Sequence, residues 1–460
     1  MPLIKSISGF RGTIGGRPDE GLTPIDIVKL TSAYICLIRR GGVKRPRIVV
    51  GRDGRLSGDM VNRLVCGTLQ SMGADVIDIG LSTTPTTEIA VTKLKADGGV
   101  ILTASHNPKE WNALKLLDNK GEFIDAADGK WLLEKADSDE YVFSGIDEIG
   151  SYTREEGWMD KHADLVCALP LVKKDIIAKA GLKVVVDGVN STGGIAIPAL
   201  LRKLGVKDIV ELNCEVTGEF AHNPEPLAVN LVDTCKAVKE LGADLGIVVD
   251  PDVDRLAFID ENGLMFGEEY TLVTVASYIL ENVKGNTVSN LSSTRALRDV
   301  TIAAGGEYSA SAVGEVNVVA KMKEVNAVIG GEGNGGVIYP ELHYGRDALV
   351  GVGLFLSYLC EKKCSVSQLK NSFPIYYMSK NKIQLTPSTN VDKILEEIAE
   401  RFKDEKVTTI DGVKIDFADG WVHLRKSNTE PIIRVYSEGK SEKEADQLAQ
   451  SMLNVANTLM

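Results

Sequence analysis

The feature that most constrains the fold is a weak internal repeat of apolar strand, Gly-rich turn, helix and second strand. The first copy runs from RIVVGRDGRLSG (47–58) to ADVIDIG, and the second from KVVVDGVNSTGG (183–194) to KDIVEL. A third runs from NTVSNLSSTRALRD (286–299) to EYSASAV. Apolar strands with little alternation, each followed by a helix, are typical of parallel βαβ units covered on both faces. Unequal spacing between the copies indicates successive similar domains with different insertions, not a solenoid.

The pattern changes near residue 373. A helical segment, VDKILEEIAERFKD, precedes the strand-like VKIDF, WVHLR and IIRVYSEG, and a final helix is expected from about Glu442. Helices that cover an antiparallel sheet indicate an α+β domain. The predicted fold class is therefore α/β, with three similar mixed or parallel α/β domains and a C-terminal α+β domain. The expected boundaries are 1–148, 149–255, 256–372 and 373–460.

Composition narrows the function. Hydrophobic residues make up 44% of the 460 residues and charged residues 25%, which is ordinary for globular domains. A net charge of −12 argues against a general nucleic-acid binder, although a few arginines can still bind a phosphorylated ligand. The seven cysteines form no CxxC pair, which argues against disulfides or zinc and favours a reducing compartment. Without a signal peptide or membrane span, we expect a soluble, cytoplasmic protein with no membrane partner.

The segment TASHNP (103–108) follows the apolar strand GGVILT and would display Ser105 at the tip of a tight turn. A serine nucleophile needs a base or a phosphate-stabilising environment. His106 is adjacent, and Lys115 lies nearby in the sequence. The absence of G-x-S-x-G disfavours an α/β-hydrolase elbow. The alternative is an ordinary Ser/Asn/Pro turn.

The segment DPDVDR places carboxylates at Asp250, Asp252 and Asp254 at the end of an apolar strand. Open α/β sheets bind ligands at the carboxyl ends of their strands, and hard oxygen ligands suit Mg²⁺. A solvated acidic edge is the simplest alternative. An EF-hand loop would need Gly where Arg255 stands, and a haloacid-dehalogenase-type phosphatase would need different residues at 254 and 255.

Two later segments contain polar residues suited to a phosphosugar. GGEGNGG (330–336) offers Glu332 and Asn334 to sugar hydroxyls, although a Gly-rich hairpin turn has the same composition. RKSNTEP (425–431) combines hydroxyl and amide groups with arginines, a mixture that binds phosphate dianions. A capping turn with unrelated arginines is the alternative. The candidate phosphate-binding residues are Arg425, Ser427, Asn428, Thr429 and Arg434.

Together, TASHNP, DPDVDR, GEGNGG and RKSNTEP resemble the motifs of the α-D-phosphohexomutases, in the same order and along the whole chain. This resemblance implies four domains around a central cleft, each with one loop in the active site. It also implies interconversion of hexose 6-phosphate and hexose 1-phosphate. Mg²⁺ would be the cofactor, and a hexose 1,6-bisphosphate the intermediate and activator.

The resemblance also assigns roles to residues. Ser105 is similar to the serine that holds the transferable phosphoryl group, and one of its phosphate oxygens would join the three aspartates around Mg²⁺. Lys115 and Arg11 resemble the residues for proton transfer and charge stabilisation. The resemblance also places His106 and Arg255 at active-site positions, and it implies that Arg255 contacts the substrate.

Glu332 and Asn334 resemble the residues that contact sugar hydroxyls, and the RKSNTEP residues with Arg434 resemble the phosphate clamp. The chain departs from the commonest pattern at Asn334, where Ser is usual, and at Gly336, where His is usual. Ala312 stands where Lys is usual.

Glucosamine 6-phosphate is the preferred substrate, because family members with GEGNGG are associated with phosphoglucosamine mutases. Phosphomannomutase/phosphoglucomutase activity is the next alternative. A Mg²⁺-dependent phosphatase with Asp250 as nucleophile and a phosphosugar-binding regulator are more distant ones. The sequence leaves open whether the protein is a monomer or a homodimer.

Overall fold

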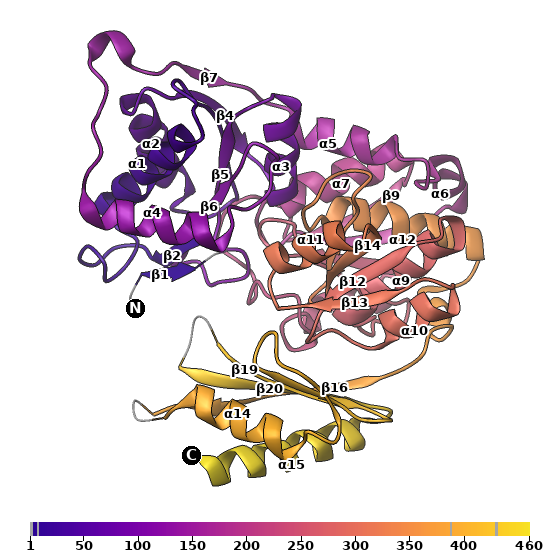
Figure 1. Cartoon of the computed structure of the whole chain (residues 1–460). Coiled ribbons are helices and arrows are strands. Elements are labelled where there is room, and N and C mark those ends of the chain that lie inside the picture. The colour runs from indigo at the N-terminus through magenta and orange to yellow at the C-terminus, as the bar shows by residue number, and fades with distance from the viewer. Residues whose placement is uncertain (1–2, 7–8, 387–388, 428–430) are drawn as a thin grey trace. The chain divides into compact units, whose positions relative to one another are not determined.

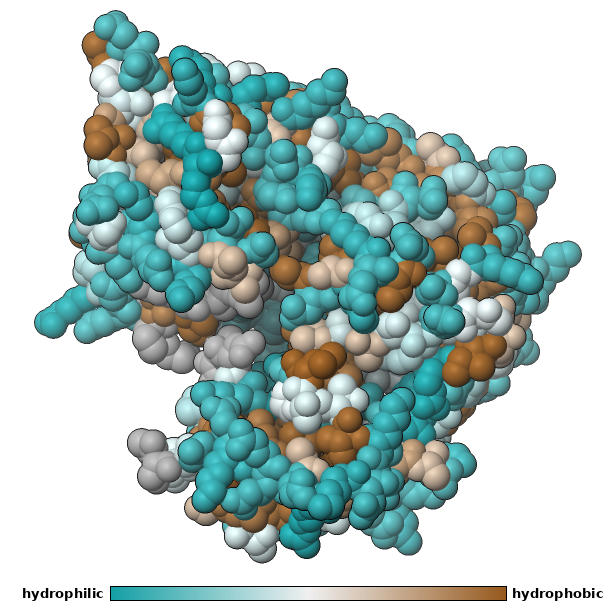
Figure 2. Space-filling model, in the orientation of Figure 1, coloured by the Kyte–Doolittle hydropathy of each residue, from teal (hydrophilic) through white to brown (hydrophobic). Residues whose placement is uncertain are grey.

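The computed structural model describes residues 3–6, 9–386, 389–427 and 431–460. It divides into two compact units: Met1–Tyr278 with Asn334–Lys370, and Ile279–Gly333 with Asn371–Met460. On the face shown in Figure 2, most surface side chains are hydrophilic, as expected for a chain with 25% charged residues. Of the helices in the described ranges, none has both the length and the apolar character needed to span a bilayer.

The first unit begins with a seven-stranded sheet of order β1-β2-β6-β5-β3-β4-β7. Its strands are β1 (Ile4–Ser6), β2 (Gly9–Thr13), β3 (Arg47–Arg52), β4 (Asp75–Leu81), β5 (Gly98–Leu102), β6 (Trp111–Leu117) and β7 (Tyr152–Arg154). β3 pairs in parallel with β4 and β5, whereas β6 runs antiparallel to both β5 and β2. The first copy of the repeat therefore forms the predicted βαβ unit.

Helices cover both faces of this sheet, because alternate residues of β3 point into different cores (Figure 1). Ile48 and Val50 pack into the core beneath α1 and α2, while Val49 packs with Val91 of α3 and Trp158 of α5. Each such buried side chain contributes about 1.5–3 kcal/mol. The helices are α1 (Pro24–Arg40), α2 (Gly58–Ser71), α3 (Thr84–Lys93), α4 (Ala126–Ser138), the 3₁₀ helix η1 (Ile146–Glu148) and α5 (Trp158–Cys167).

The second sheet of this unit has the order β9-β8-β10-β11. β8 pairs in parallel with β9 and β10, and β11 runs antiparallel to β10, so the second copy of the repeat is also a βαβ unit. The strands are β8 (Lys183–Asp187), β9 (Asp208–Leu212), β10 (Leu245–Val249) and β11 (Leu256–Ile259). The helices are α6 (Lys174–Ala180), α7 (Gly193–Leu204), η2 (Ala228–Asn230), α8 (Val232–Glu240), α12 (Ala348–Lys362) and α13 (Val366–Lys370).

The second unit contains the third copy of the repeat. β12 pairs in parallel with β13, as predicted, and also with β14. The chain enters this unit through α9 (Glu268–Asn282) and returns to the first unit before β15 (Gly336–Ile338). The remaining elements of this part are β12 (Asn286–Asn290), α10 (Ala296–Ala303), β13 (Tyr308–Ser311), α11 (Glu315–Glu324) and β14 (Ala327–Glu332).

The C-terminal part of the second unit is an antiparallel sheet of order β16-β20-β19-β18-β17, with α14 and α15 on one face (Figure 1). Leu424 and Val435 belong to the core with these helices. The predicted α+β architecture is therefore confirmed, although β16 and β17 were not foreseen. The elements are β16 (Tyr377–Gln384), α14 (Val391–Arg401), β17 (Lys406–Thr408), β18 (Val413–Asp416), β19 (Trp421–Lys426), β20 (Ile432–Gly439) and α15 (Glu442–Leu459).

The repeats place the motif loops at equivalent positions. TASHNP connects β5 to β6, and DPDVDR connects β10 to β11. In both sheets the loop leaves the carboxyl end of a parallel strand and leads into an antiparallel neighbour. This is the edge at which open α/β sheets bind ligands.

The predicted Gly-rich loop at 330–336 is shorter than expected, because β14 continues to Glu332. A Cβ on Gly330 would lie 2.4 Å from the Sδ of Met322, so this glycine lets α11 pack closely on the strand. Two strands begin just after a predicted domain boundary. β7 begins after the boundary at residue 148, and β11 begins after the boundary at residue 255. The boundaries themselves remain a prediction.

A buried ionic cluster connects α3 and α5 with the segment before α12. His343 lies 3.3 Å from both Glu88 and Asp347, and His162 Nε2 lies 2.9 Å from Asp347 Oδ2. Burial lowers the pKa of His343, but Asp347 and Glu88 outweigh this effect and raise the pKa to about 10. Asp347 also caps α12 by accepting hydrogen bonds from the N–H groups of Leu349 and Val350.

This cluster predicts a loss of stability in alkali. The contribution of charged His343 is complete below its ordinary pKa of 6.5 and disappears as the pH rises towards 10. We expect the wild-type free energy of unfolding to fall by about 2–4 kcal/mol more between about pH 7 and pH 10 than that of His343→Gln. Urea denaturation of both proteins at each pH measures this difference, and equal decreases would contradict it.

Candidate active site

Ser105 lies in a strained and buried turn. Its φ of +49° is in the left-handed region, which typically costs a non-glycine residue about 1–3 kcal/mol. The residue is only 5% exposed, and its Oγ donates a hydrogen bond to Asp250 Oδ2 at 2.6 Å. Its backbone N–H donates to Thr103 Oγ1 at 2.9 Å. An ordinary surface turn is neither buried nor strained in this way.

Arg55 holds this turn from inside the domain, and sequence reasoning missed it. Its guanidinium donates to the backbone carbonyls of four residues: Ser105, Asn107, Pro108 and Trp111. The side chain is fully buried and pairs with Asp53 at 3.1 Å. The sequence identified GRDGRLSG only as a Gly-rich turn after a strand, and it had no signal that Arg55 reaches a loop fifty residues away.

Asp250, Asp252 and Asp254 form a fully buried cluster, with one carboxylate oxygen of each within 4.8 Å of the others. The loop between them is tightly wound, because Val253 has a φ of +62°, a rare conformation for a β-branched residue. Asp250 Oδ1 accepts hydrogen bonds from the backbone N–H groups of Asp254 and Arg255, at 3.2 and 3.0 Å. The DPDVDR segment is therefore an interior loop and not a solvated acidic edge.

Burial and the nearby charges of Asp254 and Asp252 raise the pKa of Asp250 well above its usual range. Burial acts in the same direction on Asp252, but Lys115 outweighs it and lowers the pKa of that carboxyl. Buried like charges at this separation favour binding of a cation.

Two cations and a hydroxyl group contact the outer oxygens of the cluster. Lys115 Nζ lies 2.7 Å from Asp252 Oδ2 and 3.3 Å from Asp254 Oδ2. Thr84 Oγ1 donates to Asp252 Oδ2 at 2.6 Å, and Arg346 Nη2 to Asp254 Oδ2 at 2.7 Å. The Oδ1 atoms of both aspartates are buried and have no hydrogen-bond partner among the described residues. These orphaned carboxylate oxygens fit a hard divalent cation such as Mg²⁺.

Further predicted residues lie around Ser105. His106 Nδ1 is 3.4 Å from Ser105 Oγ, and burial, with Arg255 and Arg11 nearby, lowers the pKa of His106 well below 6.5. Arg11 of β2 donates to Asn107 Oδ1 at 3.4 Å. Arg255 instead pairs with Glu225 at 3.3 Å. The first unit thus brings Ser105, His106, Lys115, Arg11, Arg255 and the three aspartates into one neighbourhood.

The two predicted sugar-contacting residues fall in different units. Glu332 ends β14 in the second unit, is 4% exposed, and accepts hydrogen bonds from Asn290 Nδ2 at 2.8 Å and Gly314 N–H at 3.1 Å. Asn334 lies in the first unit, where its Oδ1 accepts from the N–H of Gly336 at 3.2 Å. Their contact with a sugar remains a prediction.

The predicted phosphate clamp lies in the second unit. Arg425 of β19 and Arg434 of β20 are register partners, and Lys382 of β16 lies directly opposite Arg434 on the other side. Directly opposed residues share a face of the sheet, where like charges destabilise each other unless an anion is bound. The sequence did not predict Lys382, because its pairing depends on the edge strand. Ser427 follows β19 and is buried, while Asn428 and Thr429 lie outside the described residues.

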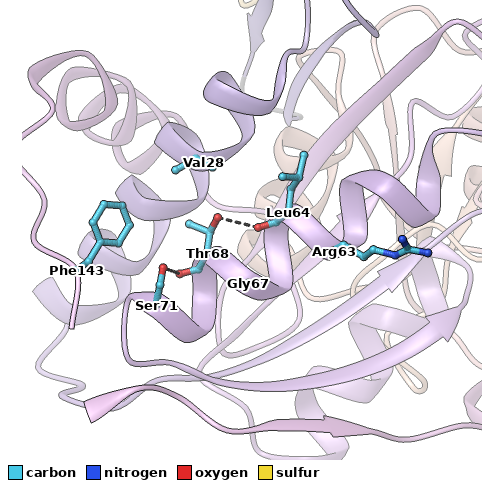
Figure 3. Close-up of a pocket in the computed structure, with 7 residues that line it drawn as sticks. All are labelled: Val28, Arg63, Leu64, Gly67, Thr68, Ser71 and Phe143. Carbon is cyan, nitrogen blue, oxygen red and sulfur yellow. Dashed lines mark hydrogen bonds between the residues drawn. The ribbon is translucent and has the colours of Figure 1, made fainter. Parts of the chain in front are cut away.

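An open pocket between α1 and α2 contains none of the candidate residues (Figure 3). The hydroxyl groups of Thr68 and Ser71 donate to backbone carbonyls within α2, and Arg63 pairs with Asp59. Its lining residues are Val28, Arg63, Leu64, Gly67, Thr68, Ser71 and Phe143.

Comparison with known proteins identifies the class. Four domain families described as "Phosphoglucomutase/phosphomannomutase" match the chain in order: alpha/beta/alpha domains I, II and III at residues 4–142, 160–263 and 267–376, and the C-terminal domain at 386–455. The chain therefore belongs to the α-D-phosphohexomutase family, and the protein is an isomerase of the intramolecular phosphotransferase type.

Individual relatives agree with this assignment. A phosphoglucomutase/phosphomannomutase of Thermococcus kodakarensis is 38% identical over 440 residues, which cover 94% of this chain and 95% of the relative. A phosphoglucosamine/phosphogalactosamine mutase of Sulfurisphaera tokodaii is 34% identical, with 99% of each chain covered. The crystal structure of a phosphoglucomutase/phosphomannomutase family protein from Burkholderia thailandensis matches with a TM-score of 0.86 at 26% identity, covering 99% of this chain and 97% of that one.

The contacts of Arg55 predict a strong effect of Arg55→Lys. A lysine keeps the charge but cannot donate to all the carbonyls of the Ser105 turn, and displacement of a reacting group by about 1 Å costs roughly 100-fold in rate. We expect kcat to fall by about 10–100-fold, in addition to a loss of stability. Arg52→Lys is the matched control, because Arg52 contacts only the carbonyl of Asp53 among the hydrogen bonds described. A destabilised Arg55→Lys enzyme with normal kcat would contradict the positioning role.

Proposed function

We propose that this phosphohexomutase converts glucosamine 6-phosphate to glucosamine 1-phosphate through a phosphoserine at Ser105 and a 1,6-bisphosphate intermediate. The main supporting observation is the hydrogen bond of a buried, strained Ser105 to the Asp250–Asp252–Asp254 cluster. A hydroxyl group held against a cation-binding cluster is suited to carry a phosphoryl group.

Phosphoryl transfer depends mainly on charge stabilisation and positioning. A phosphoserine at position 105 would carry a charge of about −1.5 to −2 at neutral pH. The three aspartates, with one phosphoserine oxygen, would hold Mg²⁺, which when bound supplies Lewis-acid stabilisation of the phosphoryl oxygens. Lys115 and Arg11 add positive charge around the same group.

In the transfer step, a sugar hydroxyl oxygen bonds to phosphorus as the bond from phosphorus to Ser105 Oγ breaks. Burial lowers the pKa of Lys115, but Asp252 and Asp254 outweigh it and raise the pKa, so Lys115 acts as a cation. Burial, Arg255 and Arg11 lower the pKa of His106, so its ring is neutral and only weakly basic. It is proposed to take the hydroxyl proton and pass it to the departing Ser105 Oγ, which lies 3.4 Å from Nδ1. Return of the other phosphate of the bisphosphate to Ser105 completes the isomerisation.

The Lys382–Arg434–Arg425 row of the second unit is proposed to bind the phosphate that is not reacting. A row of cations recognises a phosphate ester regardless of which carbon carries it. Such recognition suits a bisphosphate that must bind in two orientations. Glu332 and Asn334 are proposed to contact sugar hydroxyls, and Arg255 the substrate.

The choice of glucosamine rests on relatives. The S. tokodaii protein and a Methanopyrus kandleri protein with 31% identity both have phosphoglucosamine mutase in their names. The T. kodakarensis relative supports phosphoglucose and phosphomannose as the runner-up substrates. A cytoplasmic location is part of the proposal and is supported by seven free cysteines.

A phosphatase with Asp250 as nucleophile is less compatible with the contacts. Asp250 Oδ1 accepts two backbone N–H groups and Oδ2 accepts the Ser105 hydroxyl. Burial also raises the pKa of this carboxyl, which leaves less of it in the ionised form that could attack phosphorus.

The substrate is tested by phosphorus NMR with Mg²⁺, trace hexose 1,6-bisphosphate and equal concentrations of glucosamine, mannose and glucose 6-phosphates. We expect the glucosamine 1-phosphate signal to grow first. Equal growth of all three 1-phosphates would indicate broad specificity. Inorganic phosphate alone would support the phosphatase, and binding without turnover would support a phosphosugar-binding regulator.

Ser105→Ala should abolish isomerisation, because no oxygen remains to carry the phosphoryl group. Binding of the phosphosugar should persist, since the proposed phosphate-binding row is unchanged. Turnover is measured in the NMR assay and binding by calorimetry. Measurable isomerisation by this variant would exclude the phosphoserine mechanism.

A further inference from the structure

Arg346 reaches the aspartate cluster from the segment between β15 and α12. Its side chain is buried, and Nη2 donates to Asp254 Oδ2 at 2.7 Å. Lys115 contacts the same oxygen at 3.3 Å, so Arg346 makes the shorter of the two contacts. The other oxygen of Asp254, Oδ1, is buried and has no hydrogen-bond partner in the part of the chain that the structure describes. Arg346 thus fixes the orientation of the Asp254 carboxylate, with Oδ2 hydrogen-bonded and Oδ1 left available within the cluster.

Gly336 provides the space that Arg346 occupies. A Cβ at position 336 would lie 2.3 Å from Cδ of Arg346, closer than real Cβ atoms approach other atoms, and 3.0 Å from Cγ, which is also a tight contact. The backbone of Gly336 is outside the positive-φ region, so its conformation does not require glycine. The glycine is needed because the arginine stem lies against it.

The backbone around Arg346 is held on both sides. Arg346 forms a β-bridge with Ile338, and the N–H of Asp347 donates to the carbonyl of Val337 at 2.8 Å. The side chain of Asp347 belongs to the buried ionic cluster with His162 and His343. Arg346 is therefore part of a rigid support and not a mobile surface side chain.

We propose that Arg346 is a positioning residue for the metal ligand Asp254, and that Gly336 is present in the sugar loop to admit it. This inference rests on the proposed metal site of the mutase. A partner that orients a metal-binding carboxylate typically contributes about 10–100-fold to metal affinity.

The direction of the effect distinguishes positioning from simple charge. A cation close to the metal ligands repels a divalent cation, so loss of charge alone would tighten metal binding. Loss of orientation leaves Asp254 free to rotate and weakens binding. Arg346→Met removes both the charge and the hydrogen bond, whereas Gly336→Ala displaces the arginine without removing its charge.

The experiment is a Mn²⁺ titration of the full-length protein, followed by the EPR signal of free Mn²⁺. We expect Arg346→Met and Gly336→Ala each to raise the Kd about 10-fold or more. The double variant should be no weaker than Arg346→Met, because both changes break the same contact. Arg63→Met is the control, since Arg63 is 78% exposed and pairs only with Asp59 among the ion pairs described.

The outcomes separate this inference from the proposed function. If wild-type protein fails to bind Mn²⁺, or Asp254→Asn binds it as tightly, the proposed metal site itself is wrong. If wild-type binding depends on Asp254 but Arg346→Met binds as tightly or more tightly, only the positioning role is wrong. Additive effects of the two substitutions would overturn the link to Gly336. Thermal unfolding of the same samples identifies any variant that fails to fold. If Arg346→Met fails to fold, the Kd of Gly336→Ala alone tests the proposal.

Discussion

The mutual repulsion of three buried carboxylates is the constraint on which the first unit depends. Asp250, Asp252 and Asp254 lie within a few ångströms of one another and are shielded from water, an arrangement that is costly without positive charge nearby. Lys115 and Arg346 supply that charge from different parts of the chain. Their bonds leave one oxygen of Asp252 and one of Asp254 for a cation. The packing of the segments that carry Lys115 and Arg346 therefore depends on the charge of the aspartate loop.

Most of the fold was predictable because its signals are local. Runs such as RIVVG and KVVVD are too apolar to be one-sided strands, and each is followed by a helix, which leaves parallel βαβ units as the simplest solution. The edge strand β16 (Tyr377–Gln384) was missed because its residues alternate poorly and are mostly exposed or half-buried. Gly330 was misread as part of a turn because a glycine needed for helix packing looks the same in sequence as one needed for a bend.

Some residues of the candidate site were likewise predictable from the sequence, and others were not. Residues inside compact motifs, such as Ser105 and the aspartates, could be named because three or four informative residues stand together. Arg55, Thr84 and Arg346 could not, since each acts on a motif distant in the sequence, through contacts that only the folded chain creates. Lys382 escaped notice because it depends on strand register. The supporting residues of a site are therefore harder to predict than the residues that they support.

The equivalent placement of the motif loops has an evolutionary consequence. Loops that leave the same position of repeated βαβ units are each anchored by their own pair of strands, yet the third loop is also coupled to the aspartate loop, because Gly336 lies against the Arg346 side chain that contacts Asp254. Gly336 begins β15, and Asn334 lies just before it, between β14 and β15. Evolutionary change at position 336 is therefore limited by the aspartate loop, since any side chain there would displace the arginine that contacts Asp254.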